Sequence, residues 1–161
     1  MSYYKLIAGL RVPSKAPAAL LQQIGTAPSM RNLTYLRLGS CQSPALDPLS
    51  SLTRLVRLHL HVVNGHVTPL TTLSMLTYLH LHGHVDDLAV ALGSFRKLQK
   101  LSLIKCKRLR ADEVRAVGTL AALTSLELPC SKASFPPRDI RPLARLKVLP
   151  SASRDLSIFF K

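Results

Sequence analysis

The chain has 161 residues, 47% of them hydrophobic and 5% aromatic, which is enough apolar material for one domain with a sizeable core and argues against disorder. The 22 Lys and Arg against 8 Asp and Glu give a formal net charge of +14, which favours acidic proteins, nucleic acid or anionic membrane surfaces as partners. No stretch approaches the roughly 18 uninterrupted apolar residues needed to cross a membrane, so the sequence argues against a membrane span.

The first 29 residues are predicted to form an irregular N-terminal coil or cap. Leu6 and Ala8 are spaced as strand positions, and the segment from Ala18 to Ile24 has a helical pattern. We therefore expect this region to hold an atypical copy of the unit that follows it.

From residue 30 onward the pattern LxxLxxLxL, with Leu or a close substitute at the marked positions, recurs at intervals of 21 to 25 residues. The clear copies read MRNLTYLRL, LTRLVRLHL, LSMLTYLHL, FRKLQKLSL and LAALTSLEL, and a weaker copy, LARLKVLPS, begins at Leu143. We predict five repeats over residues 30–142 and a degraded repeat or C-terminal end over residues 143–161, all within a single domain over residues 1–161.

The LxL part of each copy alternates with the period of a β-strand. Leu36 and Leu38 should point to one side of the strand, while Tyr35, Arg37 and Gly39 point to the other. Because one coil cannot bury its leucines alone, the copies must stack, which predicts a parallel sheet.

The segments that return the chain between strands are predicted to differ. DDLAVALGS and ADEVRAVGT have the pattern of short helices, with Asp86 or Asp87 and then Asp112 as N-caps. QSPALDPLSS and NGHVTPLTT carry Pro with Ser or Thr, which favours turns or 3₁₀ pieces.

These copies and their spacing resemble the leucine-rich repeat family from about residue 30 to 150. The resemblance implies an α/β solenoid, an arc with a concave parallel β-sheet and a convex side of short helices, 3₁₀ turns and loops. The PLSSL and PLTTL returns are similar to the intracellular 22-residue class, and the repeat containing Cys106 is similar to the cysteine-containing class. The family pattern also implies that Cys41 and Cys106 are buried thiols that donate weakly to backbone.

The repeat register predicts three columns of side chains on the concave face. The first holds Tyr35, Arg57, Tyr78, Lys100 and Ser125, the second Arg37, His59, His80, Ser102 and Glu127, and the third Gly39, His61, His82, Ile104 and Pro129. Aromatic and Arg residues are frequent anchors of protein interfaces. We therefore expect a partner to bind the N-terminal half of this face, through Tyr35, Arg37, Arg57, His59, His61, Tyr78, His80, His82 and Lys100.

Four histidines, His59, His61, His80 and His82, fall at corresponding positions of adjacent strands and form a predicted grid. Three interpretations stay open. The grid is a polar part of the binding surface, a transition-metal site of imidazole ligands, or a pH-sensitive interface that gains charge near pH 6. The outward, parallel direction of the side chains favours the first.

A basic segment runs from Arg96 to Arg115. It holds Arg96, Lys97, Lys100, Lys105, Lys107, Arg108, Arg110 and Arg115, and its KCKRLR run is typical of a nucleic-acid or nuclear-localisation stretch. The repeat register divides these charges between the two edges of the sheet, which weakens this alternative.

Signatures of catalysis, namely GxSxG, HExxH, a Walker loop and GxGxxG, do not occur in the sequence. We expect a non-catalytic protein-interaction module without a cofactor, binding an acidic protein. The alternatives are a basic nucleic-acid-associated protein and a fragment of a larger receptor or ubiquitin-ligase adaptor.

The cysteines are too few and too widely spaced for a disulfide scaffold, and the first residues do not have the pattern of a signal peptide. Together these predict a cytoplasmic location, with nuclear or cytoskeletal association left open.

Overall fold

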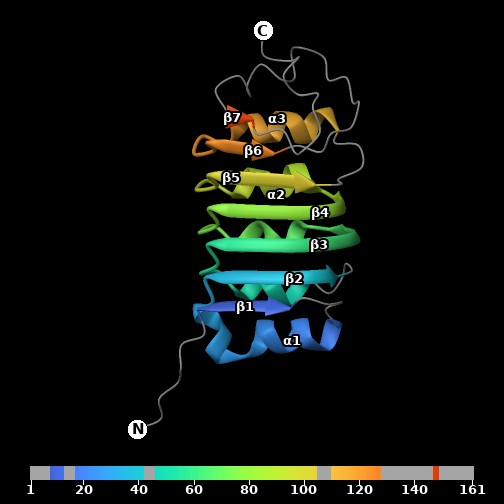
Figure 1. The fold of residues 1–161 in the computed structure, drawn as a ribbon, viewed down its shortest axis with the longest axis vertical. Coiled ribbons are helices and arrows are strands. Elements are labelled where there is room, and N and C mark those ends of the chain that lie inside the picture. Colours follow the sequence, from blue (N-terminus) through green and yellow to red (C-terminus); the bar gives the residue numbers. More distant parts are fainter. Residues whose placement is uncertain (1–7, 13–16, 42–45, 105–109, 128–146, 149–161) are drawn as a thin grey trace.

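The computed structural model describes residues 8–12, 17–41, 46–104, 110–127 and 147–148. In these ranges the chain forms one parallel sheet whose strands follow each other in chain order (Figure 1). The strands are β1 (Gly9–Val12), β2 (Tyr35–Cys41), β3 (Arg57–His66), β4 (Tyr78–Asp86), β5 (Lys100–Ile104), β6 (Ser125–Glu127) and β7 (Lys147–Val148). The returns contain helices α1 (Ala18–Thr26), α2 (Leu88–Ser94) and α3 (Ala111–Thr119), and 3₁₀ turns η1 (Pro28–Asn32), η2 (Asp47–Ser51) and η3 (Thr68–Thr72).

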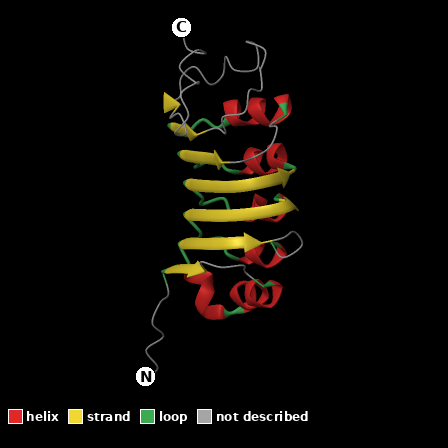
Figure 2. Ribbon diagram, turned by 45° about the vertical axis from the view of Figure 1, so that its right-hand side comes forward, coloured by secondary structure: helices red, strands yellow, loops and turns green. Residues whose placement is uncertain are grey.

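The sheet forms one side of the molecule and the helices and 3₁₀ turns form the other (Figure 2). The predicted α/β solenoid is therefore confirmed. The division into an N-terminal coil, five repeats and a degraded end stays a prediction.

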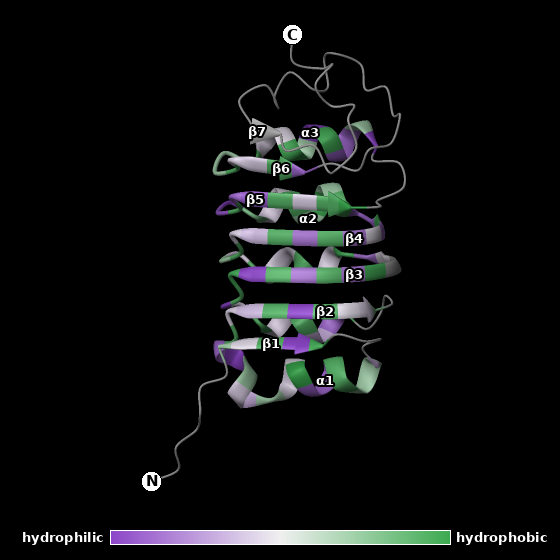
Figure 3. Ribbon diagram, viewed as in Figure 1, coloured by the Kyte–Doolittle hydropathy of each residue, from purple (hydrophilic) through white to green (hydrophobic). Residues whose placement is uncertain are grey.

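The core lies between these two layers and consists of stacked rows of leucine. Residues at equivalent positions pair in register across the sheet, for example Leu36 with Leu58 and Leu58 with Leu79, and all three are fully buried. Along each strand, apolar and polar positions alternate (Figure 3). Since each row is completed by the neighbouring coil, burial of one coil depends on the coils beside it.

The predicted helices and 3₁₀ pieces of the convex side are confirmed as α2, α3, η2 and η3. Asp87 is the N-cap residue of α2, although its side chain makes no capping hydrogen bond. The prediction for α3 was wrong, because Arg110 is the N-cap and Asp112 lies in the first turn. The Glu113 carboxylate accepts a hydrogen bond from the Arg110 backbone N–H at 2.8 Å. An acidic side chain at the third helical position therefore caps the backbone of the N-cap residue.

The predicted helical segment before residue 30 is confirmed, and the predicted strand positions there are corrected. Helix α1 covers the predicted helical segment. In β1, Leu10 pairs with Leu36 and Val12 with Leu38, so these two residues hold the inward positions. Ala8 precedes the strand and is exposed, which makes its predicted strand position wrong, and Leu6 lies outside the described residues.

Strands β3 and β4 extend further than the pattern indicates. Part of the NGHVTPLTT segment, predicted as a turn or 3₁₀ piece, continues β3 as far as His66. The two strands pair again from Gly65 and Val85 after a register shift. At the other end of the sheet, Val148 pairs with Leu126, one residue earlier than the LARLKVLPS copy predicts.

Hydroxyl groups tie successive coils together directly before the strands and within the layer of helices and 3₁₀ turns. The bonds join the Oγ1 of Thr34, Thr77 and Thr124 to the carbonyls of Ala8, Val56 and Gln99, and the hydroxyls of Ser51 and Thr72 to the carbonyls of Gly25 and Ser50. Each bond crosses from one coil to the preceding one. These ladders hold the coils in a fixed stacking order, which positions the side chains of the concave face.

Candidate binding surface

The register of the sheet places the first two predicted columns as expected. Tyr35, Arg57, Tyr78, Lys100 and Ser125 are successive partners, and so are Arg37, His59, His80, Ser102 and Glu127. The inward leucines between them are buried, so these residues face away from the core. The role of these side chains in binding stays a prediction.

The third column is corrected at its N-terminal end. His61, His82 and Ile104 are partners as expected, but His61 pairs with Ser40 instead of Gly39. The register shifts between Leu38 and Ser40, because β2 holds one residue more than β3 at this point. Pro129 lies outside the described residues.

Strand β1 adds an arginine to the face that the sequence reasoning missed. Arg11 pairs with Arg37 and so extends the second column by one strand. Its guanidinium carbon lies 5.5 Å from the centre of the Tyr35 ring, within the range of a cation–π contact. The alternation of Leu10, Arg11 and Val12 was the available signal, but β1 lies outside the repeat pattern.

The rings of the face form a connected cluster around His59. Its ring centroid lies 4.9 Å from that of Tyr78, 5.2 Å from that of His80 and 5.7 Å from that of Tyr35. The His61 and His82 rings meet edge to face at 4.3 Å. The predicted grid therefore exists, as two sets of packed rings.

A shallow hollow of about 520 Å³ lies over this cluster. It is lined by Arg11, Val12, Arg37, Leu38, Gly39, His59, Leu60, His61, His80 and His82. A second hollow of about 450 Å³ is lined by Arg11, Thr34, Tyr35, Val56 and Arg57. Arg11 thus borders both, and the two hollows adjoin on the N-terminal half of the face.

Burial and the charges of the face lower the pKa values of two histidines. Burial, followed by the charges of His80, Arg37, Arg11 and Arg57, lowers the pKa of His59 to about 4. Burial also lowers the pKa of His80, with Glu127 acting in the opposite direction. His59 is consequently uncharged at pH 6, so the pH-sensing interpretation does not hold for it in the free protein.

The metal interpretation of the grid finds no support in the geometry. Across the part of the chain that the structure describes, no three His, Cys, Asp or Glu side chains are grouped so that they could hold a metal ion. The imidazoles of the grid pack against each other and against Tyr35 and Tyr78 instead.

The character of the face changes towards β6. Ser102 is buried and donates a hydrogen bond of 2.6 Å to the Glu127 carboxylate. From β1 to β5 the described positions of the three columns hold no acidic residue, and Glu127 is the first, although Asp86 lies further along β4. The N-terminal half is therefore the basic and aromatic half.

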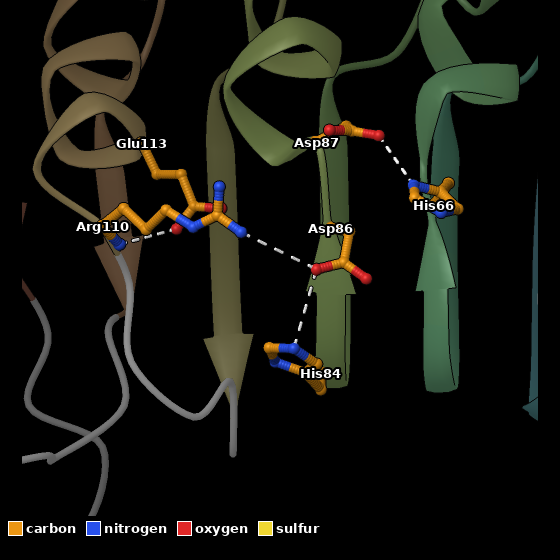
Figure 4. A network of polar contacts seen from close by, with 6 residues as sticks. All are labelled: His66, His84, Asp86, Asp87, Arg110 and Glu113. Atoms are coloured by element: carbon orange, nitrogen blue, oxygen red, sulfur yellow. Dashed lines mark hydrogen bonds and ion pairs between the residues drawn. The ribbon is translucent and has the colours of Figure 1, made fainter.

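The basic segment from Arg96 to Arg115 is divided as the repeat register predicts. Arg96 and Lys97 lie in the turn before β5, whereas Arg110 lies beyond the other end of that strand and contacts Asp86 at 3.9 Å (Figure 4). Asp86 also lies 3.7 Å from His84, and Asp87 lies 2.7 Å from His66. Acidic residues thus offset part of the positive charge at this border. Lys105, Lys107, Arg108 and Cys106 lie outside the described residues.

Cys41 fits the structural role that the family resemblance implied. It is 2% exposed, and its thiol donates to the His61 carbonyl at 3.3 Å. Burial raises its pKa to about 11, which keeps the thiol protonated. The thiol therefore supports the backbone of the neighbouring strand.

The coiled strand-and-turn architecture and its open face define a leucine-rich repeat solenoid, and solved structures share this fold. An internalin (inlF) of Listeria monocytogenes matches with a TM-score of 0.64 and 21% identity, over 88% of this chain and 39% of its own. Internalin C2 (inlC2) of the same organism matches with a TM-score of 0.55 and 22% identity, over 81% of this chain and 57% of its own. The chain therefore spans well under two thirds of either internalin. No family model and no curated protein matches the sequence.

Among the described helices, none has the length and apolar character that spanning a membrane requires.

Proposed function

We propose that this chain is a non-catalytic protein-interaction module that binds an acidic protein through its concave face. The observation that carries the proposal is the set of basic and aromatic side chains that the three columns present from β1 to β5, among which no described position is acidic. Such a surface attracts a negatively charged partner and offers it large aromatic contacts. The fold shared with the internalins supports a binding role, because a solenoid presents an open face for contact.

The shape of the face argues against an enzyme. The hollow over the ring cluster is shallow and open, whereas catalysis generally needs a site that excludes water. Nucleic acid is the second candidate, but the positive residues at the borders of β5 are separated and partly paired with Asp86. The cytoplasmic location stays a prediction.

Affinity capture with charge-reversed variants tests the proposal. We expect the double variant Arg37→Glu and Arg57→Glu to lose at least one acidic protein that the unchanged chain retains. The matched control reverses Arg31 and Arg96, which are exposed residues outside the strands, and should retain that protein. Direct titration of the captured protein should then show an affinity that falls with added salt. Equal capture by both double variants would rule out the concave face as the binding surface.

A further inference from the structure

The three arginines at the N-terminal end of the concave face lie within a small patch. Arg11 and Arg37 are partners on neighbouring strands, and Arg57 is the partner of Tyr35, two residues before Arg37. Neighbouring strands lie roughly 4.8 Å apart and alternate residues roughly 6.6 Å apart, so flexible side chains from all three positions can meet over one point.

None of these arginines is paired with a carboxylate within the described residues, whose ion pairs involve Asp86 and Asp87 at the far border. Glu127, the first acidic residue of the three columns, lies on β6. This strand is four strand spacings from β2, or roughly 19 Å. Three like charges held close together favour an anion between them. Burial and His80 are the larger causes of the lowered pKa of His59, and the three arginines lower it further.

We propose that Arg11, Arg37 and Arg57 form a site for a phosphate monoester carried by the partner protein. This inference rests on the proposed function and specifies its chemistry. A guanidinium is a planar fork of donors that fits two oxygens, so a carboxylate with two oxygens satisfies a single fork. A phosphate monoester has three terminal oxygens and a charge near −2 at pH 7, which matches three forks.

The space around the patch suits such a group on a side chain. Arg11 borders both hollows, with Arg37 and His59 in the larger and Tyr35 and Arg57 in the smaller. The larger hollow, about 520 Å³, leaves room for the residue that carries the phosphate, and neutral imidazole nitrogens there can donate hydrogen bonds. A phosphodiester of nucleic acid carries one charge and two free oxygens, so it can accept hydrogen bonds from fewer of the N–H donors of the three guanidinium groups.

NMR of the histidine rings of the whole chain over a pH titration downward from 7.5, with and without inorganic phosphate, tests the site directly. An anion in the larger hollow stabilises the imidazolium form, so the pKa of His59 should rise from about 4 as phosphate binds. The groups that face His59 and influence this titration are Arg11 on β1, Tyr35 and Arg37 on β2, Arg57 on β3, and Tyr78 and His80 on β4. Phosphate that binds elsewhere would leave the His59 signals unmoved.

Matched variants separate this site from general attraction. Arg37→Gln should weaken phosphate binding by on the order of tenfold, because it removes one charge-assisted fork. Arg96→Gln removes the same charge from the turn before β5 and should leave binding unchanged. Circular dichroism of both variants checks folding, which an exposed strand residue of this face should not disturb. Equal weakening by both changes would overturn the inference.

A peptide experiment distinguishes the inference from the proposed function. The probes are a Glu-rich peptide with one phosphoserine, the same peptide with Glu in place of the phosphoserine, and an oligothymidine strand, each at 150 mM salt. We expect the phosphopeptide to bind at least tenfold more tightly than the other two. Equal binding of the two peptides would overturn the phosphate site while leaving an acidic partner in place. Tighter binding of the oligothymidine would overturn it in favour of nucleic acid.

Discussion

His59 and His80 lie on neighbouring strands with their ring centroids 5.2 Å apart; burial and then the charge of His80 lower the pKa of His59, and burial lowers the pKa of His80. Two imidazolium groups at this distance would repel each other, and Arg37 adds a third positive charge to both. At the centre of the proposed binding surface, burial and the neighbouring positive charges therefore both disfavour the charged form of the imidazoles.

The first prediction concerns stability at acidic pH. The pKa of His59 is about 4 in the folded chain and near its ordinary value of 6.5 when unfolded, so the unfolded state binds more protons between these values. The contribution of His59 is thus present above pH 6.5 and is lost as pH falls towards 4. Urea unfolding of the unchanged chain and of His59→Gln at pH 7, 6, 5 and 4 measures this. The unchanged chain should lose more stability, and parallel curves would contradict the assignment.

The second prediction compares two glycines. Gly83 in β4 has φ +108°, and a Cβ there would overlap the carbonyl oxygen of Val62, so Gly83→Ala should destabilise the fold through both strain and a collision with backbone. Gly93 in α2 has open space around it, and Gly93→Ala should stabilise the fold by about 0.5–1 kcal/mol. Thermal unfolding of both variants checks the opposite signs. A loss of stability in both would show that α2 is more tightly packed than the structure indicates.

The third prediction concerns the leucine rows. Leu79 is fully buried between Leu58 and Leu101, so Leu79→Ala should cost about 2–5 kcal/mol. Val90 in α2 is 60% exposed, and Val90→Ala should change stability by less than about 0.5 kcal/mol. Denaturant unfolding measures both values. Similar costs for the two changes would contradict the assignment of Leu79 to the core.

The sequence predicted the columns because strand alternation and repeat spacing are enough to decide which residues share a face. It did not predict Arg11, because the pattern before residue 30 is degenerate: Leu6 and Ala8 fit the spacing of a strand as well as Leu10 and Val12, which hold the inward positions. The bulge that places Ser40 beside His61 cannot be predicted from the periodic pattern. One extra residue within β2 changes the register with β3 but does not change the types of residue that the pattern contains. Ring contacts such as that of His59 with Tyr78 depend on side-chain rotamers, which spacing does not determine.

The fourth prediction concerns Cys41. Because the thiol is 2% exposed and its pKa is raised to about 11, little thiolate forms at pH 8 and reagents have poor access. Peptide mapping after brief treatment with iodoacetamide should show Cys41 unmodified in the folded chain and modified in urea. Rapid labelling of Cys41 without denaturant would contradict its burial.

The fifth prediction tests the hydroxyl ladder at the N-terminal end. The Ser51 hydroxyl bonds the Gly25 carbonyl of α1 at 2.6 Å, whereas the hydroxyl of its neighbour Ser50 bonds Asp47 within the same turn. Ser51→Ala should therefore cost about 0.5–1.5 kcal/mol more than Ser50→Ala, because it leaves a carbonyl between two coils without this donor. Among the described strands, β1 pairs with β2 alone, so the loss should also appear locally, as faster amide exchange in α1 with little change in β4. Urea unfolding and hydrogen exchange measure the two effects. Uniform acceleration across the sheet would show that the coils open together, and equal behaviour of the two variants would show that the bond to Gly25 contributes nothing to stacking.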